Sequence, residues 1–525
     1  MGYLLVQLVR QFFSGKRSHF LVVVQNNNEL RSTGGYATNV LDLEVGKWGM
    51  KKRFLDVNTD LKHEKDEAPP GAMARLLKVK SVQFRDANYD PDFGRSAALM
   101  EKLYGYSFPE HDVTLITAVN FRFLERLLEI LGPVKVHGKQ WTAQNVFFEM
   151  STDAANIDLH NKEARAQRKS SIKLLFQKLV RMAMMKPWLW WKLRTLFWNA
   201  VAMKDLQCAS SKKKIADGLT TRGLLKSFSF ETPDFLAVVD NNYLGSKSNR
   251  YVRRSVQHDV RFEFDKDKKA LGDALVKVRL QFDHLGGLNY PLSAGYQSFV
   301  QLFIPRDAEI VATSTDCSIE KKNDFSALGF QQLIQWGKQA SYEFSYRLPT
   351  ELFQKGYAYT FWGQSGAMDG QLVESVYFPQ QIDIRHVDGS EKVQEHVARY
   401  EGLAQDHHYS LTVHPHQGAP RIYFHEIVRP NEIEIQFNEP VSIEGKAADA
   451  VAICDSMNKD PIEVERVVQE KDDRFLKIIV KDLPATPNRF YDVVLTNIYG
   501  LGGNGFRGNE KKVTVVYRPQ FFRKD

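Results

Sequence analysis

The sequence predicts an α/β domain at the N-terminus, followed by two β-sandwich domains. From residue 19 to about residue 225, short apolar runs typical of strands alternate with amphipathic runs typical of helices. After residue 235, apolar residues alternate with polar ones, which is the period of half-buried strands. After residue 419, strand-like runs recur at a spacing of roughly ten residues. These changes predict domains at 1–230, 231–385 and 419–520, with a linker at 386–418.

Composition indicates large folded cores and limits the partners. The chain has 525 residues, of which 43% are hydrophobic and 26% charged, so extended disorder is not expected. Its net charge of +8 is modest, and no recognition-module signature accompanies it, so we expect no nucleic-acid partner. The three cysteines have neither zinc-site spacing nor a disulfide pattern.

Two apolar segments raise the question of membrane contact. The first, MGYLLVQLVRQFF, lacks the features of a secretion signal and predicts a short amphipathic helix. The second, MAMMKPWLWWKLRTLFWNAVAM at 182–203, is rich in tryptophan but is interrupted by Lys186, Lys192 and Arg194. We therefore do not expect it to cross a bilayer.

The elements of the first domain follow from these patterns. Strands are predicted at HFLVVV, VLDLEV, DVTLITAV and PVKVHG, and helices at PPGAMARLLKVK, GRSAALMEKLYGY, NFRFLERLLEIL and SIKLLFQKLVRMAMM. Segments such as DFLAVVDNN, LVKVRLQFDHL and SFVQLFIP predict the following β-sandwich. The charged stretch 386–408 marks a boundary or a solvated helix, and NEIEIQFNEPV to FYDVVLTNIYG predict an immunoglobulin-like sandwich.

The stretch QNNNELRSTGGY at 25–36 places polar residues directly after an apolar strand. Arg31 could bind a phosphate with two parallel hydrogen bonds, and Gly34 and Gly35 would let the backbone approach an anion. Asn28 is a further candidate ligand-binding residue. The alternative is a polar turn whose asparagines satisfy the backbone.

The stretch RDANYDPDFGRSA at 85–97 carries a cluster of carboxylates. Asp86 and Asp92, with Asn88 nearby, could hold Mg²⁺ beside a phosphate. The alternative is that Asp92 caps the helix that starts near Arg95, and that Asp90 and Pro91 form a turn.

Other polar stretches carry weaker signals. Arg165, Arg168 and Lys169 in HNKEARAQRKSSIK could meet a pyrophosphate or form a solvated helix face. The basic residues of NNYLGSKSNRYVRR at 241–254 are interpreted as surface charge, and His414 and His416 have no further ligand at metal-site spacing.

Taken together, these motifs resemble a bacterial family known as domain of unknown function 4012. The matching segments are Gln25 to Gly35, Asp86 to Phe93, residues 112–146 and Asp240 to Arg253, and the resemblance extends over roughly residues 1–380. That family is in turn similar to the LytR-CpsA-Psr phosphotransferases, which have an α/β/α fold. Those enzymes transfer glycopolymers from polyprenyl-pyrophosphate carriers to the cell wall, using magnesium and a ring of arginines.

This resemblance implies a site and a location. Arg31 and Arg168 would be catalytic, Arg165 and Lys169 would bind the ligand, and the segment 187–203 would line a channel for the lipid tail or form a core helix. We would then expect an extracytoplasmic protein of the cell envelope at a membrane surface, whose membrane anchor is missing from this chain or whose start is truncated. The C-terminal sandwich resembles bacterial immunoglobulin-like domains.

Two positions depart from the phosphotransferase pattern. Thr33 stands where those enzymes carry an aspartate that binds magnesium, and Asn120 and Phe121 replace an Asp-Pro pair. Two hypotheses follow. The first is a phosphotransferase-like protein that binds a polyprenyl-pyrophosphate-linked glycan or cell-wall polymer, and the second is a non-catalytic surface scaffold that binds glycan or protein.

Overall fold

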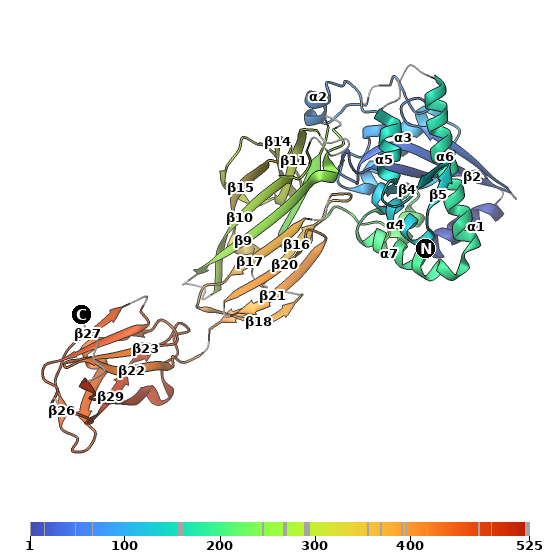
Figure 1. The fold of residues 1–525 in the computed structure, drawn as a ribbon. Helices are drawn as coiled ribbons and strands as arrows, with labels where there is room; N and C mark the ends of the chain where they lie inside the picture. Colours follow the sequence, from blue (N-terminus) through green and yellow to red (C-terminus); the bar gives the residue numbers. More distant parts are fainter. Residues whose placement is uncertain are drawn as a thin grey trace.

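The computed structural model describes most of the chain. The described residues are 2–14, 16–47, 49–65, 67–155, 162–243, 246–265, 270–287, 294–353, 356–367, 370–389, 392–394, 396–416, 418–470, 473–484 and 486–519. They form an elongated molecule with a mixed helix and strand domain at one end and β-sheets along the rest of its length (Figure 1).

The N-terminal domain is built on a five-stranded sheet with the order β3-β2-β1-β4-β7. Its strands are β1 (Ser18–Asn26), β2 (Tyr36–Gly46), β3 (Gly49–Asp56), β4 (Val113–Asn120) and β7 (Leu206–Ala209), and β5 (Val134–Val136) and β6 (Lys139–Trp141) form a separate hairpin. Strands β1 and β4 run parallel, whereas the other neighbours are antiparallel.

Helices cover both faces of this sheet because β1 is apolar on both faces. Phe20 and Val24 pack into a cluster with α4, α5, α6 and α7, and Leu21 and Val23 pack into a second cluster with α3. The helices are α1 (Gly2–Ser14), α2 (Gly71–Leu77), α3 (Phe93–Ser107), α4 (Phe121–Leu131), α5 (Val146–Ala155), α6 (Lys162–Met185), α7 (Trp190–Ala202) and α8 (Lys213–Thr220), with 3-10 turns η1 (Phe84–Asp86) and η2 (Pro187–Leu189). The prediction of a mixed α/β region is confirmed.

Two seven-stranded sheets follow, and we call this region the two-sheet domain. One sheet has the order β12-β15-β10-β9-β17-β20-β19 and the other β13-β14-β11-β8-β16-β21-β18. Inward residues of both sheets form one large cluster, which includes Val256 and Val278 from the first sheet and Val238 and Leu302 from the second. The strands are β8 (Asp234–Asn241), β9 (Val252–Asp265), β10 (Ala270–His284), β11 (Tyr296–Pro305), β12 (Glu309–Thr313), β13 (Ser318–Lys321), β14 (Phe325–Ile334), β15 (Gln339–Leu348), β16 (Tyr357–Trp362), β17 (Gln371–Tyr377), β18 (Ile382–Asp388), β19 (Lys392–Gln394), β20 (Val397–Leu403) and β21 (His407–Pro415), with turns η3 (Asn249–Tyr251) and η4 (Thr350–Phe353).

Residues 386–418 differ from the expectation of a linker or solvated helix. Strand β20 pairs with β17, and β21 pairs with β16 and β18, so most of this stretch completes the two sheets. Its charged residues lie mainly on the outer faces, while Ala398, Tyr409 and Leu411 point into the core. A strand with one solvated face can therefore look like a linker in the sequence.

The C-terminal region contains two four-stranded sheets, β22-β23-β28-β27 and β26-β25-β29-β31, and a two-stranded sheet of β24 and β30. Ile433, Ile478 and Val493 belong to the cluster that the two larger sheets share. The strands are β22 (Ile422–Arg429), β23 (Glu432–Phe437), β24 (Ser442–Ile443), β25 (Val451–Asp455), β26 (Pro461–Ile462), β27 (Val464–Glu470), β28 (Phe475–Val480), β29 (Phe490–Thr496), β30 (Ile498–Tyr499) and β31 (Glu510–Val516), with turns η5 (Ala447–Ala450) and η6 (Arg507–Asn509). The immunoglobulin-like assignment of this region stays a prediction.

Candidate functional site

The polar turn after β1 lies at the junction between the N-terminal domain and the two-sheet domain. Its backbone bonds to the segment that follows β8: the Asn242 N–H donates to Leu30 O at 3.0 Å, and the Leu30 N–H donates to Asn249 Oδ1 at 3.1 Å. The Ser32 hydroxyl lies 3.1 Å from Asn241 Oδ1. The sequence motifs 25–36 and 240–254, which are more than 200 residues apart, thus meet in one network.

Arg31 is at the centre of this junction. Its Nε and Nη2 groups donate to Asp86 Oδ1 at 3.1 and 2.9 Å, and its Nη1 group donates to Leu30 O and Asn242 O at 3.1 and 2.5 Å. The arginine is 2% exposed and the aspartate 6%. A buried ion pair requires such additional hydrogen bonds to offset the loss of hydration. The structure therefore brings Arg31 and Asp86 together, as a sealed pair within the protein.

The glycines of the turn have a local structural reason. Gly34 and Gly35 adopt φ values of +129° and +143°, and a Cβ on Gly35 would lie 2.2 Å from Asn26 O. The Asn88 amide donates to Gly35 O at 2.6 Å, and Asn28 donates to Asn26 Oδ1 at 3.2 Å. Each of these predicted ligand-binding residues holds another part of the junction, and their proposed ligand-binding roles stay predictions.

The predicted magnesium residues do not suit a magnesium ion in this arrangement. Asp86 Oδ1 accepts two N–H groups from Arg31, and Asp86 Oδ2 lies 3.4 Å from Arg85 Nε. Asp92 caps α3, because its Oδ1 accepts the Arg95 N–H at 3.0 Å, and its Oδ2 accepts the Phe228 N–H at 2.8 Å. The helix-capping alternative for Asp92 is confirmed. Mg²⁺ needs free carboxylate oxygens, whereas arginine and backbone donors already occupy these.

The basic cluster of the sequence analysis cannot be placed at this junction. Arg165, Arg168 and Lys169 lie in the part of α6 whose side chains are outside the described residues. Their predicted roles remain predictions.

A cleft of about 630 Å³ opens beside the junction, between residues 89–95 and strands β11, β13 and β14. We call it the junction cleft. Aromatic residues line its base and polar residues its rim, and Arg95 and Asp90 form a two-pronged ion pair there, with N–O distances of 2.8 and 2.9 Å. The main lining residues are Tyr89, Asp90, Arg95, Tyr243, Phe299, Gln301, Phe303, Glu320, Lys322, Asn323, Asp324 and Phe325.

The charge of the junction cleft is mixed. Three carboxylates, from Asp90, Glu320 and Asp324, face two cations, from Arg95 and Lys322. Burial raises the pKa of the Tyr89 hydroxyl, and the nearby Asp90 charge acts in the same direction, so this tyrosine stays neutral and can donate a hydrogen bond. Aromatic walls with a few converging polar groups are typical of small-molecule sites at domain interfaces. Sequence reasoning singled out the stretch 85–97, which supplies Tyr89, Asp90 and Arg95 to this cleft, but the opposite wall comes from strands more than 200 residues later.

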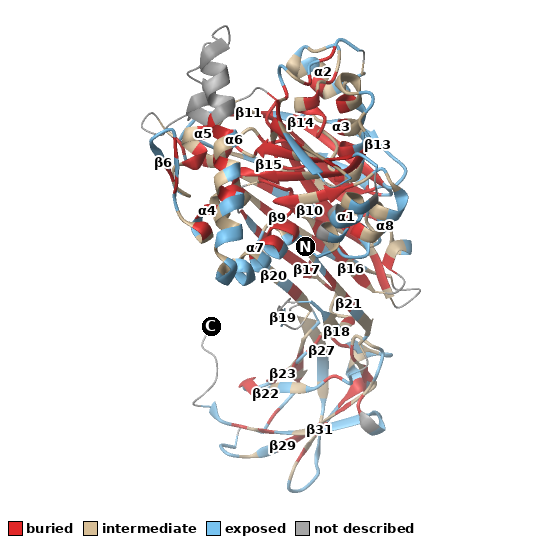
Figure 2. Cartoon of the chain, turned by 90° about the vertical axis from the view of Figure 1, so that its right-hand side faces the viewer, coloured by how far each residue is buried: buried red, intermediate tan, exposed pale blue. Residues whose placement is uncertain are grey.

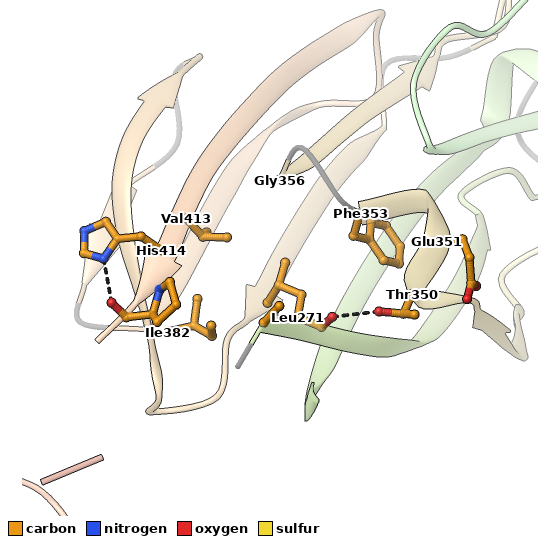
Figure 3. Close-up of a pocket in the computed structure, with 10 residues that line it drawn as sticks. Leu271, Thr350, Glu351, Phe353, Gly356, Ile382, Val413 and His414 are labelled. Carbon is orange, nitrogen blue, oxygen red and sulfur yellow. Dashed lines mark hydrogen bonds between the residues drawn. The ribbon is translucent and has the colours of Figure 1, made fainter. Parts of the chain in front are cut away.

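A second cavity, of about 380 Å³, lies at the far end of the two-sheet domain (Figure 3). Its lining is mainly apolar, from Leu271, Phe353, Ile382 and Val413, and Thr350 donates to Leu271 O at 2.7 Å. Of the polar side chains labelled in Figure 3, Glu351 and His414 lie at opposite ends of the row of residues, and Thr350 bonds to the Leu271 carbonyl. Because its polar groups do not converge, we regard the junction cleft as the better candidate site.

A group of residues that the sequence analysis missed lies on the neighbouring strands β1 and β2 and the end of α3. His19 Nδ1 is 2.8 Å from Asp42 Oδ1, Tyr104 donates to Asp42 Oδ2 at 2.8 Å, and His111 stacks on His19 with ring centroids 3.9 Å apart. These histidines and the aspartate are close enough to hold a metal ion, but Arg53 Nη2 already lies 2.8 Å from Asp42 Oδ2. The sequence signal was a charged residue in the apolar run VLDLEV.

The solved structures that resemble this chain do so at low sequence identity and with low TM-scores. The N-terminal part of the bacterial S-layer protein SbsC is 13% identical over 19% of this chain and 24% of its own length, with a TM-score of 0.18. Protein gbs0355 of Streptococcus agalactiae is 11% identical over 43% of this chain and 80% of its own, with a TM-score of 0.27. Lin1025 of Listeria innocua is 11% identical over 40% and 80%, with a TM-score of 0.24. TM-scores this low do not establish a common fold.

No curated protein matches the chain significantly. The model of one family, described as "Protein of unknown function (DUF4012)", does match, over residues 15–154. This region contains both the QNNNELRSTGG and the DANYDPDF segments. The match supports the assignment of residues 15–154 to that family of unknown function.

Proposed function

We propose that this protein is a non-catalytic scaffold of the cell envelope, which binds a saccharide in the junction cleft. The observation that carries the proposal is the state of Arg31. Its donors are taken by Asp86 and by two backbone carbonyls, and it is 2% exposed. A pyrophosphate would have to displace an aspartate and open the junction to reach it.

The lining of the junction cleft supports a saccharide over a pyrophosphate. Sugars present hydroxyl groups that accept and donate hydrogen bonds, and apolar C–H faces that pack on aromatic rings. Gln301, Asn323 and the Asp90–Arg95 pair offer both donors and acceptors, and the rings of Tyr89 and Phe299 are close by. More carboxylates than cations line the cleft, so it would repel an anionic pyrophosphate.

The same network supports the proposed scaffold role. The junction bonds the two domains through side chains and backbone, and Phe299 of β11 packs into the cluster of the N-terminal sheet. An elongated molecule with a cleft beside the junction of its first two domains suits a protein that presents a bound glycan at a distance from a surface. The envelope location and the immunoglobulin-like character of the C-terminal region are part of this proposal.

The experiment compares two ligand classes on one protein. Calorimetric titration with oligosaccharide fragments of bacterial cell wall is expected to give saturable binding, and titration with inorganic pyrophosphate and with farnesyl pyrophosphate in magnesium is expected to give none. Arg95→Ala should weaken saccharide binding by about tenfold, since it removes a charged donor from the cleft.

Arg279→Ala is the matched control. Arg279 also forms a surface ion pair, with Glu343 at 2.8 Å, and its side chain is 48% exposed compared with 54% for Arg95, but it lies on β10 outside the cleft. Saturable pyrophosphate binding that is lost in Arg31→Lys would instead support the phosphotransferase hypothesis. Saccharide binding that both arginine variants weaken equally would place the ligand elsewhere.

A further inference from the structure

The turn between α6 and α7 exposes an unusual set of large apolar side chains. Trp188, Trp190 and Trp191 are 65%, 55% and 66% exposed, and Met184 and Met185 are 71% and 63% exposed. We call residues 180–198 the tryptophan hairpin. Soluble proteins seldom expose so large a contiguous apolar patch without a partner.

The exposed tryptophans are on the faces of their helices that point away from the protein core. On α7 the residues Leu196, Phe197, Ala200 and Val201 are buried against the sheet, whereas Trp191 and Trp198 are on the opposite side of the helix. In Figure 2 the lower end of α6 and much of α7 are coloured as exposed. The buried face of α7 agrees with the alternative of a core helix for this segment, whereas its exposed tryptophans are left outside the core.

Hydrogen bonds connect the two sides of the hairpin and link it to α4. The Trp190 indole N–H donates to Ala183 O at 2.9 Å across the turn, and Lys186 Nζ donates to Leu131 O at 2.7 Å. Pro187 stands at the start of η2, where it needs no hydrogen-bond donor. The exposed rings are thus presented on a fixed turn.

Along the chain segment that forms the hairpin, the charged residues have one sign. No aspartate or glutamate occurs between Glu163 and Asp205, although acidic residues make up 63 of the 525 positions. Exposed cations flank the tryptophans on the described part of this segment: Lys173, Arg181, Lys192 and Arg194. A surface that combines apolar rings with unbalanced positive charge is complementary to a negatively charged one.

We propose that the tryptophan hairpin binds to the surface of an anionic lipid bilayer. Tryptophan prefers the boundary between lipid head groups and acyl chains, and nearby lysine and arginine are attracted to acidic head groups. The helices of the described residues do not include one with the length and hydropathy to cross a bilayer, so this contact is interfacial. It is independent of the junction cleft.

The test uses the purified full-length chain and lipid vesicles. With vesicles of 70% phosphatidylcholine and 30% phosphatidylglycerol, we expect co-sedimentation, a blue shift of tryptophan emission and quenching by brominated acyl chains. Trp188→Ala combined with Trp191→Ala should lower the partition coefficient by at least about tenfold. Lys192→Gln and Arg194→Gln should each lower it by roughly fivefold and reduce its dependence on salt.

A matched control separates the hairpin from general tryptophan exposure. Trp336, in the turn between β14 and β15, is 39% exposed, and Trp336→Ala should leave vesicle binding unchanged. Because the substituted tryptophans are on the surface, the thermal unfolding midpoint should change little, which is checked in parallel. The proposal is overturned if wild-type protein does not bind anionic vesicles, or if the hairpin and Trp336 variants bind equally well. Vesicle binding without saccharide binding would refute only the scaffold proposal.

Discussion

The junction and the core of the two-sheet domain both bury titratable side chains, but the two regions differ in how these side chains are hydrogen-bonded. At the junction, Arg31 and Asp86 are joined by two hydrogen bonds to one carboxylate oxygen, and the arginine has further carbonyl partners. In the two-sheet core, Asp234 and His258 are both fully buried, and His258 Nε2 is 3.5 Å from Asp234 Oδ2. The first pair can stay charged because its charges are matched and bonded.

The second pair is mostly uncharged between about pH 4 and 6.5. Burial raises the pKa of Asp234 to about 7, although Tyr357 donates a hydrogen bond to it at 2.6 Å, and burial lowers the pKa of His258 to about 3. The comparison indicates that hydrogen bonding separates the two cases. A buried group with many hydrogen bonds can form a permanent ion pair, whereas a buried group with few has a shifted pKa and titrates near neutral or acidic pH.

The largest expected effect comes from breaking the junction pair. Arg31→Ala leaves Asp86 buried without its main partner and should lower the free energy of unfolding by about 3–5 kcal/mol. Amide hydrogen exchange at Asn242 and Asn249 should speed up in the same variant, because their bonds to the turn depend on it. Chemical denaturation followed by exchange mass spectrometry measures both. Unchanged exchange at these amides would contradict the assignment of Arg31 to the junction.

A smaller loss is expected from the glycine that shapes the same turn. Gly35→Ala forces a side chain onto a φ of +143° and places its Cβ 2.2 Å from the Asn26 carbonyl. We expect a loss of roughly 2–3 kcal/mol in the free energy of unfolding. Gly132→Ala on α4's C-terminal cap is the control, because φ there is +89° but no atom lies within 4 Å of the added Cβ. Equal losses in the two variants would show that contact with Asn26 is unimportant.

The two-sheet core predicts opposite pH slopes in two variants. Between about pH 4 and 6.5, unfolding releases a proton from Asp234 and binds one at His258, so the two contributions to the pH dependence largely cancel. Asp234→Asn leaves the histidine, whose stabilising effect is lost as pH falls, so stability should rise with pH. His258→Gln leaves the aspartate, whose stabilising effect is lost as pH rises, so stability should fall with pH.

The expected slopes are about 1.4 kcal/mol per pH unit in each direction. Urea denaturation at half-unit steps of pH, reported by the fluorescence of the two-sheet domain, measures them. If both slopes had the reverse sign, each group would be charged in the folded protein, which would contradict this account.

The smallest effect is expected at the surface. Arg279→Ala removes an ion pair with Glu343 whose members are 48% and 42% exposed, and should change the free energy of unfolding by less than about 1 kcal/mol. Raising the salt concentration to 1 M should remove most of that difference, because salt screens exposed charges. A loss as large as that of Arg31→Ala would mean that burial is not what distinguishes the two pairs.

The sequence predicts the local features of the junction better than it predicts which distant residues meet there. The polar turn after β1, the glycines within it and the helix cap at Asp92 all follow from residue type and spacing, because each depends on neighbours within a few positions. The partners of Arg31 could not be predicted in the same way. Asn242 lies 211 positions away, and only the folded chain places its carbonyl beside the guanidinium.

Two other features escaped the sequence analysis for physical reasons. The charged stretch 386–408 looks like a linker because its strands expose one face, and single-sequence patterns do not show which strand pairs with which. The junction cleft has walls from three separate stretches of chain, 68–95, Tyr243 and 299–327, so no short motif marks it.

The most direct test of the account is a double-mutant cycle on the junction pair. Arg31→Met and Asp86→Leu are made singly and together, and the free energy of unfolding of the N-terminal domain is measured for all four proteins. A buried, mutually bonded pair predicts a coupling energy of at least about 3 kcal/mol, with the double variant more stable than either single one. A coupling energy near zero, with the Arg31 variant as stable as wild type, would show that Arg31 does not stabilise this junction and is available for a ligand.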